Sequence, residues 1–220
     1  MSADYLLQLC GSLAGGLKYT VSLFFITVLV SIPIGLLLSF TRVGRSRVLK
    51  GLVGAYVWVM RGTPLLLQLY FFCYGITFLP GIGDYLVMDR FQAAILAFIL
   101  NYAAYFCEIF RGGILSVDKG QYEAAKVLGY SKWQTTTKIV IPQMLKVCLP
   151  PVSNECITLV KDTALVSVIA VSDLMKVSYS VVSRDASVMP FFIAAVFYLI
   201  MNGVVTRILS MIEKHYAYYR

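Results

Sequence analysis

Long hydrophobic stretches alternate along the chain with short charged ones. The predominantly apolar stretches cover residues 19–40, 91–107, 147–172 and 186–206. A helix rises about 1.5 Å per residue, so about 20 residues cross a hydrocarbon core of about 30 Å. The pattern therefore predicts a membrane-spanning helix over each of these stretches.

A further apolar stretch is interrupted. Residues 52–60 are apolar but too short to span a membrane alone, and a polar break follows them. Thr63 and Pro64 resemble an N-cap and a first-turn proline, which would open a new helix over residues 65–79. We therefore expect a broken second span. Arg61 would be either an interfacial side chain that reaches water or a contact to a partner or a gate.

Residues 120–142 form a polar and basic stretch inside the otherwise hydrophobic sequence. Gly129 stands where a short helix would end in a left-handed conformation. Ser131 and Gln134 have the spacing of a capping box, which begins a second helix, and Pro142 limits how far that helix runs. We expect two short helices joined at the glycine, which form a compact knob in water.

The distribution of charge orients the spans. Residues 41–50 carry four basic side chains and no acid, and residues 111–146 carry six basic side chains against two acids. By the positive-inside rule, both segments lie in the cytoplasm. Residues 79–90 are net negative and residues 173–185 are balanced, so both fit the outer side as loops. This assignment places the N-terminus outside and the C-terminus in the cytoplasm.

Composition supports the same fold class. Of the 220 residues, 59% are hydrophobic and 14% are charged, and the mean hydropathy is +0.78. A soluble domain of this size could not bury so much apolar surface. We predict one all-α polytopic membrane domain over residues 1–220, with about five transmembrane helices. Residues 1–18 have no basic start and no cleavage site, so we expect no removable signal peptide.

The residues present also exclude several function classes. The net charge of +8 is spread over the segments between spans, so nucleic acid is not an expected partner. The chain has no GxxxxGKS/T pattern and only one histidine, His215, which excludes a P-loop, a Ser-His-Asp site and a zinc cluster. Five scattered cysteines are expected to be packing thiols. We expect a protein that is not an enzyme and holds no metal or cofactor itself.

The spacing inside residues 118–142 resembles a known pattern. Six residues match EAA-x3-G-x9-I-x-L-P, with Ile141 in place of leucine: Glu123, Ala124, Ala125, Gly129, Ile139 and Pro142. This segment is similar to the EAA loop of permease subunits of binding-protein-dependent ABC importers. Residues 61–70, 101–113 and 153–169 resemble the polar amino acid branch of that family, as in histidine, glutamine, arginine and cystine importers.

The resemblance implies a type I ABC importer permease fold and a set of partners. A separate ABC ATPase, which holds ATP and Mg²⁺, would dock in the cytoplasm on the six EAA-loop residues named above. The permease would pair with a second permease subunit, identical or different, and receive an amino acid from an extracytoplasmic binding protein. The resemblance also implies a location in the bacterial plasma membrane.

Ionisable residues in the fourth span need an explanation, because such a side chain costs about 2.5 to 3.5 kcal/mol at membrane depth. Glu155, Thr158 and Asp162 fall on one helix face, since seven residues make nearly two turns, whereas Lys161 points away from Glu155. These side chains form either a substrate or ion pathway or a salt network between helices. Lys161 and Asp162 could also lie at the membrane interface.

Two amides extend the candidate pathway. Asn101 on the third span and Asn154 on the fourth can contact the carboxylate or amine of an amino acid, or can join helices by hydrogen bonds. The second carboxylate favours arginine, lysine, histidine or ornithine over glutamate, unless Lys161 neutralises Asp162. An ion-coupled secondary transporter or channel, with Glu155 and Asp162 as proton or cation sites, is the alternative function.

Overall fold

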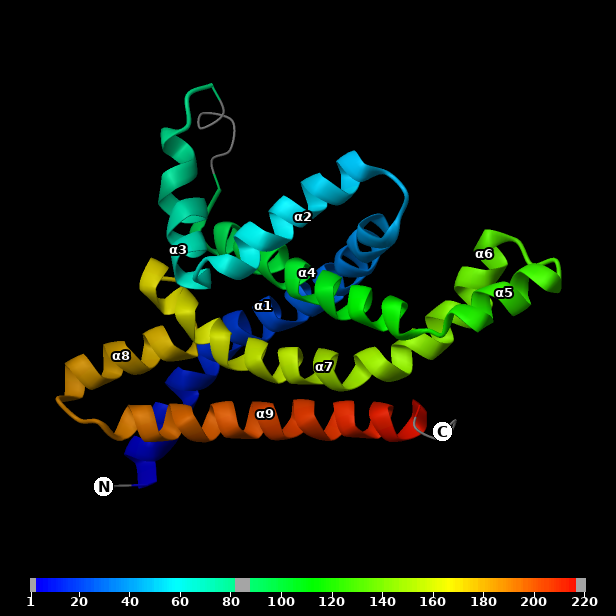
Figure 1. The fold of residues 1–220 in the computed structure, drawn as a ribbon. Helices are drawn as coiled ribbons and strands as arrows, with labels where there is room; N and C mark the ends of the chain where they lie inside the picture. Colours follow the sequence, from blue (N-terminus) through cyan, green and yellow to red (C-terminus); the bar gives the residue numbers. More distant parts are fainter. Residues whose placement is uncertain (1–2, 82–87, 217–220) are drawn as a thin grey trace.

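A computed structural model describes residues 3–81 and 88–216, and within them the regular structure is helical. Helix α1 (Ala3–Val43) runs beside α4 (Arg90–Ser116) through the centre of the molecule (Figure 1). The largest hydrophobic cluster joins these two helices to α7 (Ile141–Asp162). The three helices form the frame on which the other elements pack.

Helix α1 begins well before the predicted start at residue 19. One side of its first turns is buried by distant parts of the chain, because Leu9 and Leu13 pack against α8 (Leu174–Asp185) and α9 (Met189–Tyr216). The sequence up to residue 18 is only moderately polar, and this packing keeps it helical.

The predicted break in the second apolar stretch is present. Helix α2 (Arg47–Gly62) meets the run that starts with α3 (Leu65–Tyr70) at an angle of 104°. The prediction for Thr63 was wrong, because Pro64 takes the N-cap position of α3 and Thr63 ends α2. The Thr63 hydroxyl donates to the Val59 carbonyl at 2.8 Å instead. Helix α3 continues through a π turn and a 3₁₀ turn, η1 (Phe71–Gly75) and η2 (Ile76–Phe78).

Helix α4 runs past the predicted end of the third span at Cys107 and reaches Ser116. Its extension carries Glu108, which accepts a hydrogen bond of 2.8 Å from Arg111 and one of 3.4 Å from Arg42 of α1. Because two arginines pair with this carboxylate, the charged residues are accommodated within the helix.

The knob consists of two short helices, α5 (Lys119–Val127) and α6 (Lys132–Thr135), which protrude from one end of the molecule (Figure 1). The second short helix ends at Thr135, before Pro142, but the proline does not stop the helical path. The chain continues through a π turn, η3 (Thr136–Val140), directly into α7. The Ile141 amide donates to the Thr136 carbonyl, five residues back, so the helix already departs from the regular i to i−4 hydrogen bonds just before the proline. Pro142, which has no N–H, therefore fits at this point without breaking the helix.

Residues 173–185, predicted as an outer loop, form helix α8. After α7 the chain tightens into a 3₁₀ run, η4 (Thr163–Ile169), and α8 follows with a bend of 55°. Asp173 is fully buried and accepts hydrogen bonds from the amides of Met175 and Lys176, which caps α8. The polar sequence folds as a helix because α8 packs against α1 and α9.

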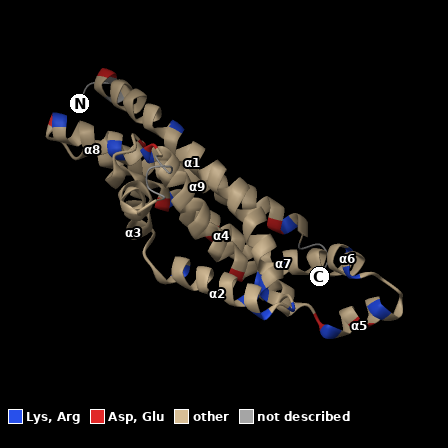
Figure 2. Ribbon diagram, turned by 90° about the horizontal axis from the view of Figure 1, so that it is seen from above, with Lys and Arg blue, Asp and Glu red and all other residues tan. Residues whose placement is uncertain are grey.

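Three helices in the described part of the chain are long and apolar enough to cross a membrane alone: α1, α4 and α9. The bent pairs, α2 with α3 and α7 with α8, raise the number to five if each pair is one span. Figure 2 shows Lys and Arg residues gathered at the end formed by α5, α6 and the start of α2. The protein is therefore an integral membrane protein with one strongly basic end.

Candidate functional site

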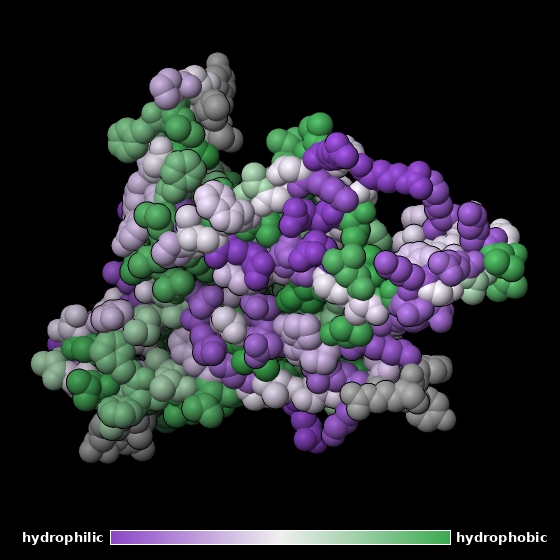
Figure 3. Space-filling model, in the orientation of Figure 1, coloured by the Kyte–Doolittle hydropathy of each residue, from purple (hydrophilic) through white to green (hydrophobic). Residues whose placement is uncertain are grey.

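A polar cavity of about 540 Å³ lies between the α2–α3 elbow, α4 and α7. Figure 3 shows hydrophilic residues across the face of the molecule that these helices form. The polar side chains that line the cavity are Arg61, Thr63, Asn101, Tyr102, Tyr105, Glu155, Thr158 and Asp162. A membrane-spanning protein thus contains a hydrophilic recess between its helices.

The predicted face of α7 is present in the structure. Glu155, Thr158 and Asp162 all line the polar cavity, whereas Lys161 is exposed and does not. Asp162 accepts a hydrogen bond of 2.7 Å from the Tyr102 hydroxyl of α4. Neither acid forms an ion pair with another residue that the structure describes. The arrangement within this chain is therefore a cavity wall and not a salt network.

The two predicted amides lie in different places. Asn101 is buried in the cavity wall, where its Nδ2 atom donates to the Met60 carbonyl at 3.1 Å and to Gln68 Oε1 at 3.0 Å. Asn154 is exposed and does not line the cavity. One residue along a helix is a rotation of about 100°, which turns Asn154 away from the side that Glu155 occupies. The structure brings Asn101, and not Asn154, into the candidate pathway.

Arg61 supplies the positive charge of the polar cavity. Its guanidinium lies over the Tyr105 ring, with 5.2 Å between Cζ and the ring centroid, a distance typical of a cation–π contact. Within residues 3–81 and 88–216, Arg61 forms no ion pair with an acid. The cavity thus offers two carboxylates and one guanidinium, which are the partners that an ammonium and a carboxylate require.

Sequence analysis missed three residues at this site: Tyr102, Tyr105 and Gln68. Aromatic side chains in an apolar helix are equally typical of core packing, so the two tyrosines gave no distinct signal. Gln68 had one, since it is an amide inside the apolar run LLLQLYFF. Its hydrogen bond to Asn101 shows that it supports the cavity wall from behind.

The turn at the tip of the knob has the predicted geometry. Gly129 has a φ of +75°, which is the left-handed conformation. Helix α5 ends in a Schellman motif, in which the Tyr130 amide donates to the Ala125 carbonyl at 2.9 Å. Ser131 and Gln134 form the expected capping box at the start of α6. The turn is therefore fixed by hydrogen bonds on both sides of the glycine.

The predicted coupling residues do not all reach the same surface. Glu123 and Ala124 are exposed on α5, whereas Ala125 is buried. Ile139 lies in η3 and Pro142 in the first turn of α7, both behind the tip. Gly129 and Pro142 are exposed like Glu123 and Ala124, so a partner could reach these four residues, whereas the buried Ala125 shapes the knob from inside.

The tip of the knob is hydrophobic. Val127 is 87% exposed, Leu128 71% and Trp133 76%, and these residues, the knob tip, flank Gly129. Figure 3 shows hydrophobic residues among hydrophilic ones at the end where α5 and α6 lie. Large apolar side chains exposed together are typical of protein–protein contact surfaces. The sequence did not predict this surface, because the same residues would also fit the buried side of a helix.

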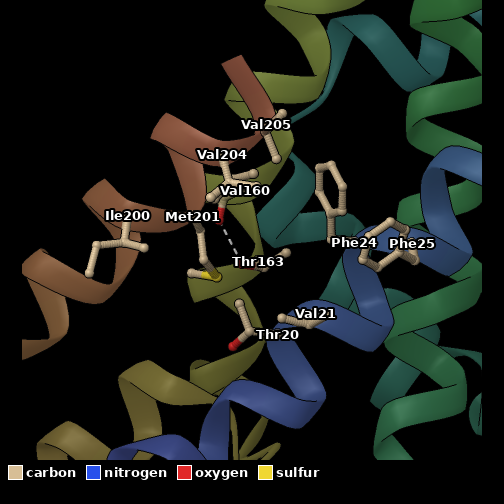
Figure 4. Close-up of a pocket in the computed structure, with 10 residues that line it drawn as sticks. All are labelled: Thr20, Val21, Phe24, Phe25, Val160, Thr163, Ile200, Met201, Val204 and Val205. Carbon is tan, nitrogen blue, oxygen red and sulfur yellow. Dashed lines mark hydrogen bonds between the residues drawn. The ribbon is translucent and has the colours of Figure 1, made fainter. Parts of the chain in front are cut away.

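A second cavity, of about 190 Å³, lies between α1, α7 and α9 (Figure 4). Its walls are apolar apart from Thr20 and Thr163, and the Thr163 hydroxyl already donates to the Val160 carbonyl at 2.7 Å. It is lined by no charged side chain. A charged amino acid placed there would lose its hydration without gaining a partner, so this cavity is not the candidate substrate site.

Known proteins resemble the chain over most of its length. The family described as "Binding-protein-dependent transport system inner membrane component" matches residues 11–218. The L-cystine transport system permease protein TcyB of Bacillus subtilis is 34% identical over 204 residues, which cover 92% of this chain and 85% of that protein. The putative glutamine transport system permease protein GlnP of Rickettsia conorii is 36% identical over 199 residues, which cover 90% and 88%.

A solved structure is similar in fold and in sequence. One chain in the crystal structure of an amino acid ABC transporter with histidines matches with a TM-score of 0.85 and 30% identity. The match covers 98% of this chain and 99% of that chain. The overall arrangement of the helices described above is thus similar to that of one chain of this transporter.

Proposed function

Because the chain belongs to the family of inner membrane components of binding-protein-dependent transport systems, we propose that its polar cavity carries a polar amino acid towards the cytoplasm. The chain is the permease subunit of an ABC importer and is not itself an ATPase. One observation carries the proposal: two carboxylates on α7 and a guanidinium at the α2–α3 elbow line the same cavity.

The charges of the polar cavity favour a cationic amino acid. Arg61 receives the α-carboxylate, and Glu155 and Asp162 receive the α-ammonium and a second positive group. Lys161 lies outside the cavity, so its ammonium does not replace the second positive group of the substrate as a partner for the acids. Arginine, lysine, histidine and ornithine meet this requirement, whereas glutamate would place a second carboxylate among the acids.

The ATPase docks on the knob tip and on the exposed part of α5. Val127, Leu128 and Trp133 supply apolar contact area, and Glu123 supplies a charge at its edge. The hydrogen-bonded turn at Gly129 presents these residues as one rigid unit, which reduces the entropy lost on binding. ATP and Mg²⁺ bind to that partner, and this chain needs no cofactor of its own.

A second permease subunit, identical or different, covers the polar cavity. The hydrophilic face in Figure 3 would be costly to expose to hydrocarbon. A second subunit placed against this face would separate it from lipid and would enclose a path for the substrate between the two subunits. Two permease subunits would also present two knobs to a pair of ATPase subunits.

The protein spans the bacterial inner membrane five times, with its N-terminus outside. The basic end seen in Figure 2 faces the cytoplasm by the positive-inside rule, and the binding protein approaches the opposite end. Cysteine probes at Ser46 and Lys132 react only from the cytoplasmic side, and a probe at Ser180 reacts only from outside. A further outer position named by the charge pattern, Asp84, lies outside the described residues. The opposite labelling pattern would reverse the orientation.

The function is tested in proteoliposomes that contain the permease and its ATPase, with the binding protein added on the side of uptake. Labelled arginine and glutamine are supplied with ATP, without ATP, and with a collapsed proton gradient. We expect uptake that requires ATP and the ATPase and that persists without the proton gradient. Uptake driven by a proton gradient in the absence of the ATPase would instead establish a secondary transporter.

A further inference from the structure

We propose that Gln68 is a positioning residue for the polar cavity, which holds the α2–α3 elbow so that Arg61 can receive the carboxylate of the substrate. The proposal rests on the proposed function, because it assigns a role to Gln68 in binding the same amino acid. Gln68 lies behind the cavity wall and does not line it.

The need for such a residue begins with Pro64. In a continuous α-helix the carbonyl of Met60 would accept the amide of residue 64, but proline has no N–H. The chain turns away at this point, with a bend of 104°. The Met60 carbonyl thus lacks its helical hydrogen-bond donor inside the protein, where an unpaired backbone group is costly.

Two buried amides satisfy this carbonyl. Gln68 Nε2 donates to it at 3.0 Å and Asn101 Nδ2 donates to it at 3.1 Å. The exposed fraction is 7% for Gln68 and 4% for Asn101, so water does not compete for these bonds. The end of α2 is therefore held by one side chain from α3 and one from α4.

Gln68 makes further bonds that close the elbow. Its Nε2 atom lies 2.8 Å from Thr63 Oγ1 and 3.3 Å from the Thr63 carbonyl, and its Oε1 atom accepts from Asn101 at 3.0 Å. One amide thus joins α3 to the last turn of α2 and to α4. A separate bond, from the Tyr56 hydroxyl to the Leu100 carbonyl, ties α2 to α4 without reaching the elbow.

The consequence falls on Arg61, which follows Met60 directly. Its guanidinium is held over the Tyr105 ring on α4, and in the described residues no acid pairs with it. Its N–H donors are therefore available to a ligand. The hydrogen bonds to the adjacent Met60 carbonyl fix the backbone from which the Arg61 side chain extends. Without Gln68 the elbow would lose its tie to α3, and Arg61 would no longer be fixed relative to Glu155 across the cavity.

The test compares arginine with agmatine, which is arginine without its carboxylate. Apparent dissociation constants for both are measured on the purified permease–ATPase complex by ligand-dependent thermal stabilisation. Gln68→Met keeps the length of the side chain and removes its hydrogen bonds. We expect it to weaken arginine binding about tenfold or more and to leave agmatine binding unchanged, since a charge-assisted contact is lost for arginine alone.

Leu69→Ala is the matched control, because Leu69 is fully buried in the same helix and touches neither the elbow bonds nor the cavity lining. It should lower the melting temperature and leave both dissociation constants unchanged. Thr63→Val removes one partner of Gln68 with almost the same shape, and should weaken arginine binding in the same direction but less. This milder variant keeps the test decisive if Gln68→Met does not assemble.

The possible outcomes separate the two proposals. Equal weakening for arginine and agmatine, or no change for either, would overturn the role of Gln68 while leaving the transporter intact. If the wild-type complex binds glutamine and not arginine, the same comparison is made with glutamine and 4-aminobutanamide. If the wild-type complex binds no amino acid from a panel of arginine, histidine, glutamine and cystine, the proposed function itself fails.

Discussion

The Tyr102 hydroxyl donates a hydrogen bond of 2.7 Å to Oδ2 of Asp162, which joins the middle of α4 to the last residue of α7. Glu155 lines the same polar cavity and has no hydrogen bond or ion pair with any residue that the structure describes. The two acids therefore differ in their surroundings. Asp162 is held by the protein, and Glu155 is free for a ligand.

Tyr102→Phe should weaken the transport of basic amino acids. The substitution keeps the ring, which stacks on Phe98, and removes the donor that orients Asp162. We expect arginine uptake to fall about tenfold or more, which corresponds to a loss of about 1.5 to 3 kcal/mol for a hydrogen bond to a charged group. Tyr56→Phe is the control, because it removes a hydroxyl bonded to a backbone carbonyl outside the cavity. Equal effects of both variants on arginine uptake would show that Tyr102 acts only through stability.

Glu155→Gln should lower the uptake of arginine more than the uptake of glutamine. A carboxylate contributes about 1.5 to 3 kcal/mol to a cationic partner, whereas a neutral hydrogen bond contributes about 1 kcal/mol. The ratio of arginine to glutamine uptake should therefore fall several-fold in proteoliposomes. An equal loss for both substrates would make Glu155 a structural residue, and unchanged uptake of both would remove it from the pathway.

Gly129→Val should weaken ATPase docking without preventing membrane insertion. A β-branched residue is strained at a φ of +75°, by about 1 to 3 kcal/mol, so the turn between α5 and α6 would open. The amount of ATPase that co-purifies with the permease should fall. Gly129→Asn, which tolerates this conformation better, should retain most of the docking. Normal co-purification with the valine variant would show that the turn geometry is not needed.

Trp133→Ala should also weaken docking, by loss of contact area and not by a change in backbone. A large aromatic residue at the centre of an interface typically contributes about 2 kcal/mol or more. Glu123→Lys should weaken docking through reversed charge, and raised salt should reduce that effect because exposed charges are screened. If Trp133→Ala binds the ATPase as tightly as the wild type, the knob tip is not the contact surface.

Glu108→Gln should destabilise the contact between α1 and α4. Glu108 pairs with Arg42 of α1 and with Arg111 of its own helix, so the amide would leave two guanidinium groups without their shared acid. We expect a loss of about 1 to 3 kcal/mol, seen as a lower melting temperature of the purified complex. Arg184→Gln is a useful comparison, because the exposed Arg184 pairs with the adjacent Asp185, and the hydrogen bond from Tyr5 to Asp185 is left in place. Similar melting temperatures for both variants would show that the Glu108 pair adds nothing beyond a surface ion pair.

Features that depend on neighbouring residues could be predicted from the amino-acid sequence alone. Pro64 lacks a backbone N–H, so a break in the second apolar stretch was predictable. Gly129 likewise indicated a left-handed turn. Ser131 and Gln134 formed their capping box because both partners lie within one turn of the same helix. The spacing of Glu155 and Asp162 placed both on one face of α7, since helical periodicity fixes that relation without any help from the rest of the fold.

Only the tertiary structure decided which distant groups complete these local patterns. The sequence shows that Pro64 removes the helical partner of the Met60 carbonyl, but Asn101 reaches this carbonyl because α4 packs against the elbow, and Gln68 reaches it because of the bend between α2 and α3. Asp162 has its partner on another helix in the same way. Residues 173–185 are polar enough for a loop and become α8 because two apolar helices bury one side of it. Local hydrogen bonds follow from sequence spacing, whereas partners far apart in the chain follow from packing, which is a property of the whole molecule.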